Sequence, residues 1–396
     1  MRNLHLPLWI DAASKPGSST FIALFAIEAV VRTTIITVVP LQAHRILHDV
    51  QKVSLLYFAV SAVGLAVSLT IPWLVDRIKR RWVFTLGAAC VVAAAALYLP
   101  AQVLPFVFAL GLQTFGAACI EVTLNLYVLD HIARKEFGRF EPMRIFFAAG
   151  AWSAGPWLGV FLENRVAHWT PFALSAGAAI LMLGYFWFLR LTDHPALPKM
   201  RRRPPNPILY LPRFFSQPRL VLAWVLAVGR SGWWAMFFVY APIYAVTSGL
   251  GENAGGAIVS LGLGSLFLVQ FWGWIGRRHG MRKLLIVGYA LTGVLTIAVG
   301  VAAGVPWLGA TFLIAAAFAA SIIDGAGNIP FLRAVRPLER PEMTTVFGTF
   351  RPASQLVPPG IFALLLEAFK LPAVFLAGGG AFLALAYFSR FIPRKL

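Results

Sequence analysis

Five charged side chains lie in the middle of segments that are otherwise apolar: Glu28, Arg32, Glu121, Arg230 and Asp324. An ionisable group at bilayer depth costs several kcal/mol unless it faces a partner or a water-filled cavity. Each of the five therefore indicates either a functional pathway or a structural ion pair. A carboxylate in an apolar cavity can change protonation when water access changes, and an arginine can neutralise it or bind an anion. The residue types thus predict proton coupling or anion binding.

A purely structural role is the alternative for these charges. Glu28 and Arg32 are four residues apart, so they share one face of a helix and can neutralise each other. Structural ion pairs between helices also place charges at such positions. We nevertheless expect Glu121 and Asp324 to be the proton-sensitive pair, with Arg32 and Arg230 as their partners or as ligands of an anionic group.

Composition sets the class of protein that holds these charges. The chain has 396 residues, of which 59% are hydrophobic and 12% are charged, whereas about a quarter of the residues of a soluble domain are charged. We therefore predict an all-α membrane protein with twelve transmembrane helices. The expected spans cover about 19–42, 53–75, 82–100, 104–129, 143–162, 170–191, 219–246, 255–276, 283–303, 306–331, 344–366 and 371–391.

The spans divide into two groups of six. We predict an N-terminal six-helix bundle at 1–192, a cytoplasmic Pro-rich basic connector at 193–217 and a C-terminal six-helix bundle at 218–396.

Orientation follows from the basic residues of the short loops. With the amino terminus inside, 28 of the 34 Lys and Arg fall on one side, which predicts that both termini are cytoplasmic.

The basic residues are spread over many loops rather than gathered on one face, which argues against nucleic-acid binding. The lipid bilayer is the expected partner, in the cell's inner or plasma membrane, with multiple passes. The first eighteen residues lack the pattern of a cleaved signal peptide.

The two groups of six also look like copies of each other. Pro40 matches Pro242 at an offset of 202, and Glu121-Val-Thr-Leu-Asn125 matches Asp324-Gly-Ala-Gly-Asn328 at 203. Such a parallel repeat predicts two pseudo-symmetric bundles with a substrate site near the membrane midplane.

The repeat places all five charges on the first, fourth, seventh and tenth helices. At the offset of 202, Glu28 is equivalent to Arg230, so we expect Glu28 to exchange partners between Arg32 and Arg230. We expect a substrate and proton-coupling cavity lined by Glu28, Arg32, Glu121, Asn125, Arg230, Trp234, Phe237, Asp324 and Asn328.

The loop after the second span resembles a known signature. Asp76-Arg77-Ile78-Lys79-Arg80-Arg81 is similar to the end of the Gly-x-Leu-Ala-Asp-Arg-x-Gly-Arg-Arg motif of the major facilitator superfamily, with Pro72 and Lys79 at the two glycine positions. The equivalent second-half loop keeps Gly273 and Gly280. The resemblance implies a conformational latch built from Asp76, Arg77, Arg80, Arg81, Gly273 and Gly280. A plain orientation signal is the alternative for these charges.

A second motif points to one branch of that superfamily. Gly155-Pro156-Trp-Leu-Gly159 resembles the Gly-Pro-x-x-Gly motif of its proton-coupled exporters, which implies the drug or metabolite:proton antiporter branch. Small residues at these positions allow close helix approach. One departure is that Leu110 occupies the place of an arginine usual in that branch.

The expected function is secondary active transport by alternating access, coupled to protons, with export of a small organic and amphipathic molecule. The proton gradient is the expected energy source, and no cofactor is implied. The alternative is an organic anion or phosphate exchanger, or an uptake carrier, that uses the arginines of the spans. We expect a monomer.

Other classes of function have weaker support in the sequence. No catalytic constellation is evident, so an enzyme is not expected. His44, His48 and Asp49 could hold a metal, but a solvated loop explains them better and no metal site is predicted. Cys90 and Cys119 do not form a disulfide framework. A non-transporting receptor would be expected to carry a sizeable soluble domain.

Overall fold

The computed structural model describes residues 17–68, 70–132, 137–189, 207–336 and 339–393, and within these ranges every regular element is a helix. The contacts between residues divide the chain into two compact units. Unit 1 comprises residues 1–39 and 63–200, and unit 2 comprises residues 40–62 and 201–396. The prediction of an all-α protein is confirmed for the described residues.

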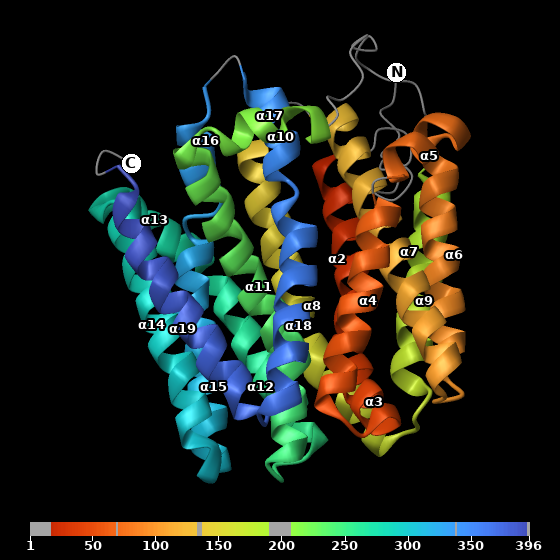
Figure 1. Cartoon of the computed structure of the whole chain (residues 1–396). Helices are drawn as coiled ribbons and strands as arrows, with labels where there is room; N and C mark the ends of the chain where they lie inside the picture. Colours follow the sequence, from red (N-terminus) through yellow and green to blue (C-terminus); the bar gives the residue numbers. More distant parts are fainter. Residues whose placement is uncertain (1–16, 69, 133–136, 190–206, 337–338, 394–396) are drawn as a thin grey trace, which may run out of the picture. The chain divides into compact units, whose positions relative to one another are not determined.

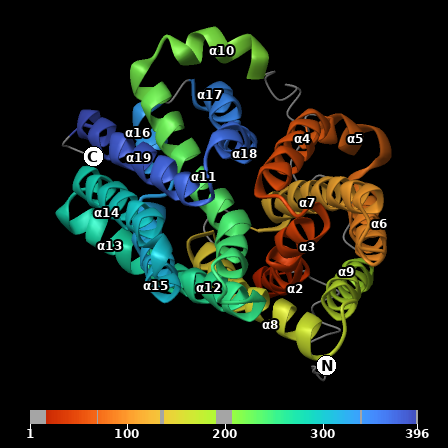
Figure 2. The ribbon, with the colours of Figure 1, turned by 60° about the horizontal axis from the view of Figure 1, so that its bottom comes forward.

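Unit 1 is built from long antiparallel helices. Helix α2 packs against α8 and α9, while α6 packs against α7 and α9, as Figures 1 and 2 show. Phe84 stacks on Phe186 with ring centroids 4.1 Å apart, inside the core that joins these helices. The helices are α2 (Ser18–Ile36), α5 (Ile71–Ile78), α6 (Arg80–Tyr98), α7 (Val103–His131), α8 (Phe137–Arg165) and α9 (Thr170–Phe188).

Unit 2 holds the remaining helices, with α14 between α15 and α19, and α11 against α12 and α18. Figure 1 shows α10 lying across the end of this unit beside α17. The helices are α10 (Pro207–Phe215), α11 (Pro218–Thr247), α12 (Glu252–Gly264), α13 (Val269–His279), α14 (Met281–Val301), α15 (Pro306–Asp324), α16 (Ile329–Ala334), α17 (Arg340–Phe347), α18 (Phe350–Ala368) and α19 (Pro372–Phe388), with short 3-10 turns at Ser265–Leu268, Ala302–Gly304 and Ser389–Phe391.

Two further helices straddle the division between the units: α3 (Val38–Leu47) and α4 (Val50–Ser68). Helix α2 ends at Ile36 and α3 begins at Val38, because Pro40 has no N–H to donate to the carbonyl of Ile36. Residues 40–62 lie in the first sequence repeat, yet they belong to unit 2.

Polar and close contacts fix residues 40–62 in unit 2. Arg45 Nε lies 3.4 Å from Glu252 Oε1 at the start of α12. The Ser54 and Tyr240 hydroxyls are 2.7 Å apart and buried. A Cβ on Gly360 would lie 2.8 Å from the Phe58 ring, so only glycine lets α18 pass here without a shift.

A helix lies in each of the twelve ranges expected to span the membrane. Within the described residues, eleven helices or helix pairs are long and apolar enough to cross a bilayer. Helix α18 is not among them, because its first turns carry Arg351 and Gln355 and its middle carries Pro358 and Pro359. The crossing of α18, the cytoplasmic termini and the limits 1–192, 193–217 and 218–396 stay predictions.

Candidate functional site

In unit 1 a single guanidinium links two helices. Arg32 Nη1 of α2 donates to Glu28 Oε1 at 3.2 Å, one turn earlier on the same helix, and lies 3.6 Å from Glu121 Oε2 of α7. The Arg32 guanidinium carbon also lies 5.9 Å from the centre of the Trp152 ring of α8. Two carboxylates therefore share one cation that three helices surround.

The two carboxylates differ in their access to the surroundings. The side chain of Glu28 is 12% exposed, whereas those of Arg32 and Glu121 are each 36% exposed. Asn125 follows Glu121 by one turn on α7 and is exposed as well. A proton or a ligand group can reach Glu121 more readily than Glu28.

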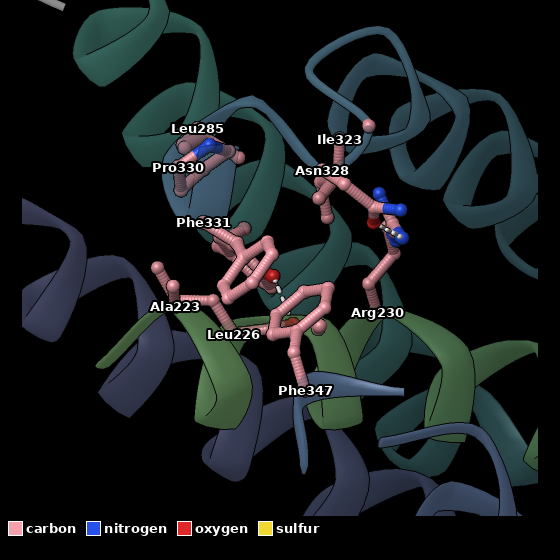
Figure 3. A pocket seen from close by; sticks show the side chains of 12 residues that line it. Ala223, Leu226, Arg230, Leu285, Ile323, Asn328, Pro330, Phe331 and Phe347 are labelled. Carbon is pink, nitrogen blue, oxygen red and sulfur yellow. Dashed lines mark hydrogen bonds between the residues drawn. The ribbon is translucent and has the colours of Figure 1, made fainter. Parts of the chain in front are cut away.

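In unit 2 the corresponding cluster centres on Asp324 at the last residue of α15. Trp234 Nε1 donates to Asp324 Oδ2 at 2.9 Å, and Arg230 Nε lies 3.7 Å from Asp324 Oδ1. Arg230 Nη2 donates to Asn328 Oδ1 at 3.0 Å, as Figure 3 shows. The Arg230 side chain is 14% exposed and that of Asp324 is 21% exposed, so this cluster is more enclosed than the one in unit 1.

The backbone around Asp324 differs from the expected continuous helix through Asn328. Helix α15 ends at Asp324, a turn follows, and α16 begins at Ile329. Gly327 in this turn has φ +52°, a left-handed conformation that glycine adopts easily. The Asp324-Gly-Ala-Gly-Asn328 segment is therefore a helix break that turns Asn328 toward Arg230.

The two clusters use positions that the internal repeat makes equivalent. Arg32 corresponds to Trp234 and Glu121 corresponds to Asp324, and in each unit the first side chain contacts the second. In each unit, a donor on one helix thus contacts an acid on another, α2 with α7 in unit 1 and α11 with α15 in unit 2. The donor is a guanidinium in unit 1 and an indole in unit 2.

A small recess lies beside Arg230 and Asn328 in unit 2 (Figure 3). Its cavity volume is about 10 Å³, which is about the space that one water molecule needs. At its wall Tyr289 donates to the carbonyl oxygen of Leu226 at 2.6 Å. It is lined by Ala223, Leu226, Ala227, Arg230, Leu285, Tyr289, Ile323, Gly327, Asn328, Pro330, Phe331 and Phe347. The recess can hold a water molecule against Arg230 but no organic substrate.

The aromatic side chains predicted to line the cavity have different surroundings. Phe237 is fully buried and stacks on Trp233 with centroids 5.2 Å apart. A Cβ on Gly262 of α12 would lie 2.6 Å from the Phe237 ring. Phe237 therefore packs α11 against α12, while Trp234 is only partly buried and holds Asp324.

The Gly155-Pro156-x-x-Gly159 segment lies where α8 crosses α2. A Cβ on Gly159 would lie 1.8 Å from the carbonyl oxygen of Thr34, and one on Gly155 would lie 2.2 Å from Thr33 Oγ1. Any side chain at either position would force the helices apart. These glycines hold α8 beside the helix that carries Glu28 and Arg32.

The predicted latch loop has a partner that sequence reasoning missed. Arg80 of α6 pairs with Asp130 near the end of α7. The only sequence signal was an acid in the last turn of a helix followed by basic residues. Arg77 lies 5.3 Å from the centre of the Trp73 ring, and the side chain of Asp76 lies outside the described residues.

The turns after α5 and α13 both adopt positive φ. Gly280 has φ +98° and ψ 129° between α13 and α14, and Lys79 has φ +68° and ψ 148° between α5 and α6. The backbone thus keeps the same kind of turn in both halves, although only the second half has glycine there. Gly273 lies against the turn that follows α15, since a Cβ on it would lie 3.2 Å from the carbonyl oxygen of Gly325.

Across the described ranges, no three His, Cys, Asp or Glu side chains are grouped so that they could hold a metal ion.

Several solved transporters have a similar fold. The nucleoside transporter NupG superposes with a TM-score of 0.71 at 13% identity, covering 95% of this chain and 98% of that one. The peptide transporter POT in complex with sulfate gives 0.74 at 14% identity, with 97% and 98% covered. A POT family transporter in complex with 5-aminolevulinic acid gives 0.75 at 14% identity, with 94% and 95% covered. At these identities the likeness shows the fold.

The sequence itself has one informative match. No curated protein matches the chain. The family model described as Major Facilitator Superfamily matches residues 21–269, which is more than half of the 396 residues. The chain therefore belongs to the Major Facilitator Superfamily of transporters.

Proposed function

We propose that this chain is a proton-coupled secondary transporter that exports a small organic, amphipathic molecule by alternating access. The observation that carries the proposal is the sharing of Arg32 by Glu28 and Glu121, at 3.2 and 3.6 Å. Protonation of either carboxylate weakens its hold on the guanidinium and leaves Arg32 to the other one. Proton uptake thus changes which helix of unit 1 holds Arg32.

The cluster in unit 2 supports the same chemistry with different donors. Asp324 accepts from Trp234 and faces Arg230, which Asn328 also holds. Loss of the carboxylate charge would release Arg230 from Asp324 and leave its bond to Asn328. Glu121 and Asp324 are therefore the proposed proton-sensitive pair, and a break in the helix beside Asp324 supplies the freedom for a local change.

The substrate assignment rests on the aromatic and apolar character of α11 around Arg230. Trp234 is partly buried and stacks on Phe238 with centroids 5.9 Å apart, which offers a flat apolar surface next to charged groups. Binding sites for organic ligands combine such surfaces with a few placed polar groups. The nucleoside and peptide transporters of similar fold are consistent with a small-molecule cargo.

An organic anion exchanger is the second candidate, because Arg32 and Arg230 could bind an anionic group directly. The exposed third of the Arg32 side chain favours this use. The carboxylate partners of Arg32 argue against the exchanger, since they occupy the guanidinium that an anion would need.

The test starts from a thermal-shift screen of the purified protein against metabolites and drug-like compounds at two pH values. A hit is then followed in proteoliposomes, with flux driven by an imposed pH gradient and, separately, by counterflow at equal pH. We expect Glu121→Gln and Asp324→Asn to reduce gradient-driven flux at least tenfold while counterflow persists. Glu367→Gln, at an exposed residue of α18, is the matched control and keeps both activities.

Two outcomes would contradict the proposal. Flux that ignores the pH gradient but requires an anion on the far side would establish the exchanger instead. If the Glu121→Gln, Asp324→Asn double variant responded to ligand and pH as the parent does, the assignment of the proton-sensitive pair would be wrong.

A further inference from the structure

Two tryptophan and arginine pairs occupy equivalent positions in the two halves of the chain. Arg77 lies 5.3 Å from the centre of the Trp73 ring on α5, and Arg278 lies 5.5 Å from the centre of the Trp274 ring on α13. Both residues of the second pair follow those of the first at an offset of 201. In each pair the arginine follows the tryptophan by four residues, so the two side chains share one helix face.

Both pairs lie at the end of a helix and are accessible. Helix α5 ends at Ile78 and α13 ends at His279, so the arginines lie in the last turns. Trp73 is 59% exposed and Trp274 is 46% exposed. Tryptophans at the ends of membrane spans lie at the level of the lipid headgroups. These rings are therefore placed for the bilayer interface and not for the core of either unit.

The guanidinium groups remain available for a ligand. Within the part of the chain that the structure describes, no carboxylate is paired with Arg77 or Arg278, and each is held by its ring. Arg80, in the same predicted latch loop as Arg77, is already engaged by Asp130. A guanidinium presents five N–H donors in a planar fork that fits phosphate oxygens.

Basic residues outnumber acids around both pairs. Arg77 is preceded by Asp76 and followed by Lys79, Arg80 and Arg81, and the segment 277–283 contains three arginines and a lysine without an acid. Phe271, which is 50% exposed, stacks on Trp274 with centroids 6.1 Å apart. An apolar aromatic surface beside clustered cations fits an amphipathic anion better than a free inorganic one.

We propose that the two pairs are repeat-related binding sites for the phosphate headgroup of an anionic phospholipid. The guanidinium binds the phosphate oxygens, while the tryptophan ring covers the upper part of the acyl chains. The distribution of basic residues predicts that the loops after α5 and after α13 are cytoplasmic, so both sites are expected in the cytoplasmic leaflet. The proposal is independent of the transported substrate and of proton coupling.

The experiment counts bound lipid on the purified full-length chain by native mass spectrometry. The probes are dioleoyl phosphatidylglycerol, with dioleoyl phosphatidylcholine as the neutral lipid. We expect the parent to retain two phosphatidylglycerol molecules preferentially, and Arg77→Gln and Arg278→Gln to retain one each. Affinity at each altered site falls roughly fivefold, as expected for the loss of one basic residue near an anionic membrane surface. We expect Trp73→Leu and Trp274→Leu to weaken lipid binding at the same sites. These variants test the sites even if an arginine variant does not fold.

Controls separate this proposal from general charge and from soluble anions. Arg165→Gln and Trp307→Leu change an exposed arginine and an exposed tryptophan at other helix ends, and we expect both to keep two bound lipids. Glycerol 3-phosphate and inorganic phosphate are added without lipid in a parallel thermal-unfolding series, where we expect no stabilisation. The proposal is overturned if the Arg77→Gln, Arg278→Gln double variant keeps both lipids. It is also overturned if the soluble phosphates stabilise the protein as the lipid does.

Discussion

Lys79 shows how a single residue can meet a backbone requirement at a cost. It has φ +68°, in the place where the second half has Gly280 with φ +98°. A side chain in this region costs of order 1 to 3 kcal/mol, which glycine avoids. The first-half turn is therefore strained at a position where the latch motif of the superfamily has glycine.

We expect Lys79→Gly to stabilise the protein by about 1 kcal/mol, since the relief of strain exceeds the extra backbone entropy that glycine loses on folding. The measurement is thermal unfolding of the purified protein in detergent. Lys283→Gly is the control, because Lys283 lies in the regular first turn of α14 and glycine there costs about 1 kcal/mol. A Lys79→Gly variant that unfolds at a lower temperature than the parent would contradict the strain.

Sequence spacing predicted some of the contacts at this scale and missed others. The four-residue separation of Glu28 and Arg32 was enough to predict their ion pair. The approach of Glu121 to Arg32, and of Asp130 to Arg80, depends on how α7 packs against α2 and α6, which spacing within one segment does not contain. The repeat supplied a partial substitute, because it identified Glu121 and Asp324 as equivalent acids.

At the scale of elements, α10 is anchored to the start of α17 by one carboxylate. Arg213 Nη2 donates to Glu339 Oε1 at 2.5 Å, and Gln217 Nε2 donates to Glu339 Oε2 at 3.1 Å. These hydrogen bonds from Gln217 and Arg213 lower the pKa of Glu339 from its ordinary value of 4.5. Phe214 of α10 is fully buried in a hydrophobic cluster that also contains Met343 and Phe347 of α17.

A lowered carboxylate pKa makes the stability of this junction depend on pH. The unfolded chain has the ordinary pKa, so the contribution of Glu339 is complete above about pH 4.5 and is lost as the pH falls through its lower folded value. We expect the thermal unfolding temperature of the parent to exceed that of Glu339→Gln at pH 6. The difference should shrink as the pH falls below about 4.

Glu367→Gln, which removes an exposed carboxylate of α18, controls for the general effect of a lost charge. A parent and a Glu339→Gln variant with the same unfolding temperature at pH 6 would contradict the anchoring role. Sequence patterns did not predict this junction, because α10 lies in a segment that reads only as a Pro-rich basic connector.

Other element boundaries illustrate the same limit. Hydropathy predicted the length of the tenth span well, but the break after Asp324 depends on four turn residues, 325–328, that include Gly325 and Gly327. Glycines are common inside membrane helices, so their presence did not indicate a break. By contrast, the separation of α2 from α3 at Thr37 is caused by Pro40, and the effect of proline on a helix can be predicted from sequence.

At the scale of the whole molecule, α18 differs from the other expected spans. Helix α18 must cross the membrane if both termini are cytoplasmic, although its proline-rich and polar first half sets it apart from the eleven more apolar spans. Hydropathy predicted twelve spans because the second half of this helix is strongly apolar, and the repeat requires a partner for the fifth helix.

We expect single cysteines at Arg340 and Lys370, on either side of α18, to react with an impermeant thiol reagent from opposite sides of the membrane. The background for both is the Cys90→Ala, Cys119→Ala variant. The Lys370→Cys variant should label in intact cells, and the Arg340→Cys variant only after the membrane is opened. Labelling of both from the same side would show that α18 does not cross.

The membership of residues 40–62 in unit 2 has a mechanical consequence. The chain passes between the units three times, and two of these passages, at 39–40 and 62–63, fall within α3 and α4 and not within loops. A loop absorbs relative displacement easily, but a helix must bend or rotate. Any rocking of one unit against the other would therefore require α3 and α4 to bend or rotate. Gly64, one residue beyond the second passage, is the single glycine of α4, and glycine is a residue at which helices can bend.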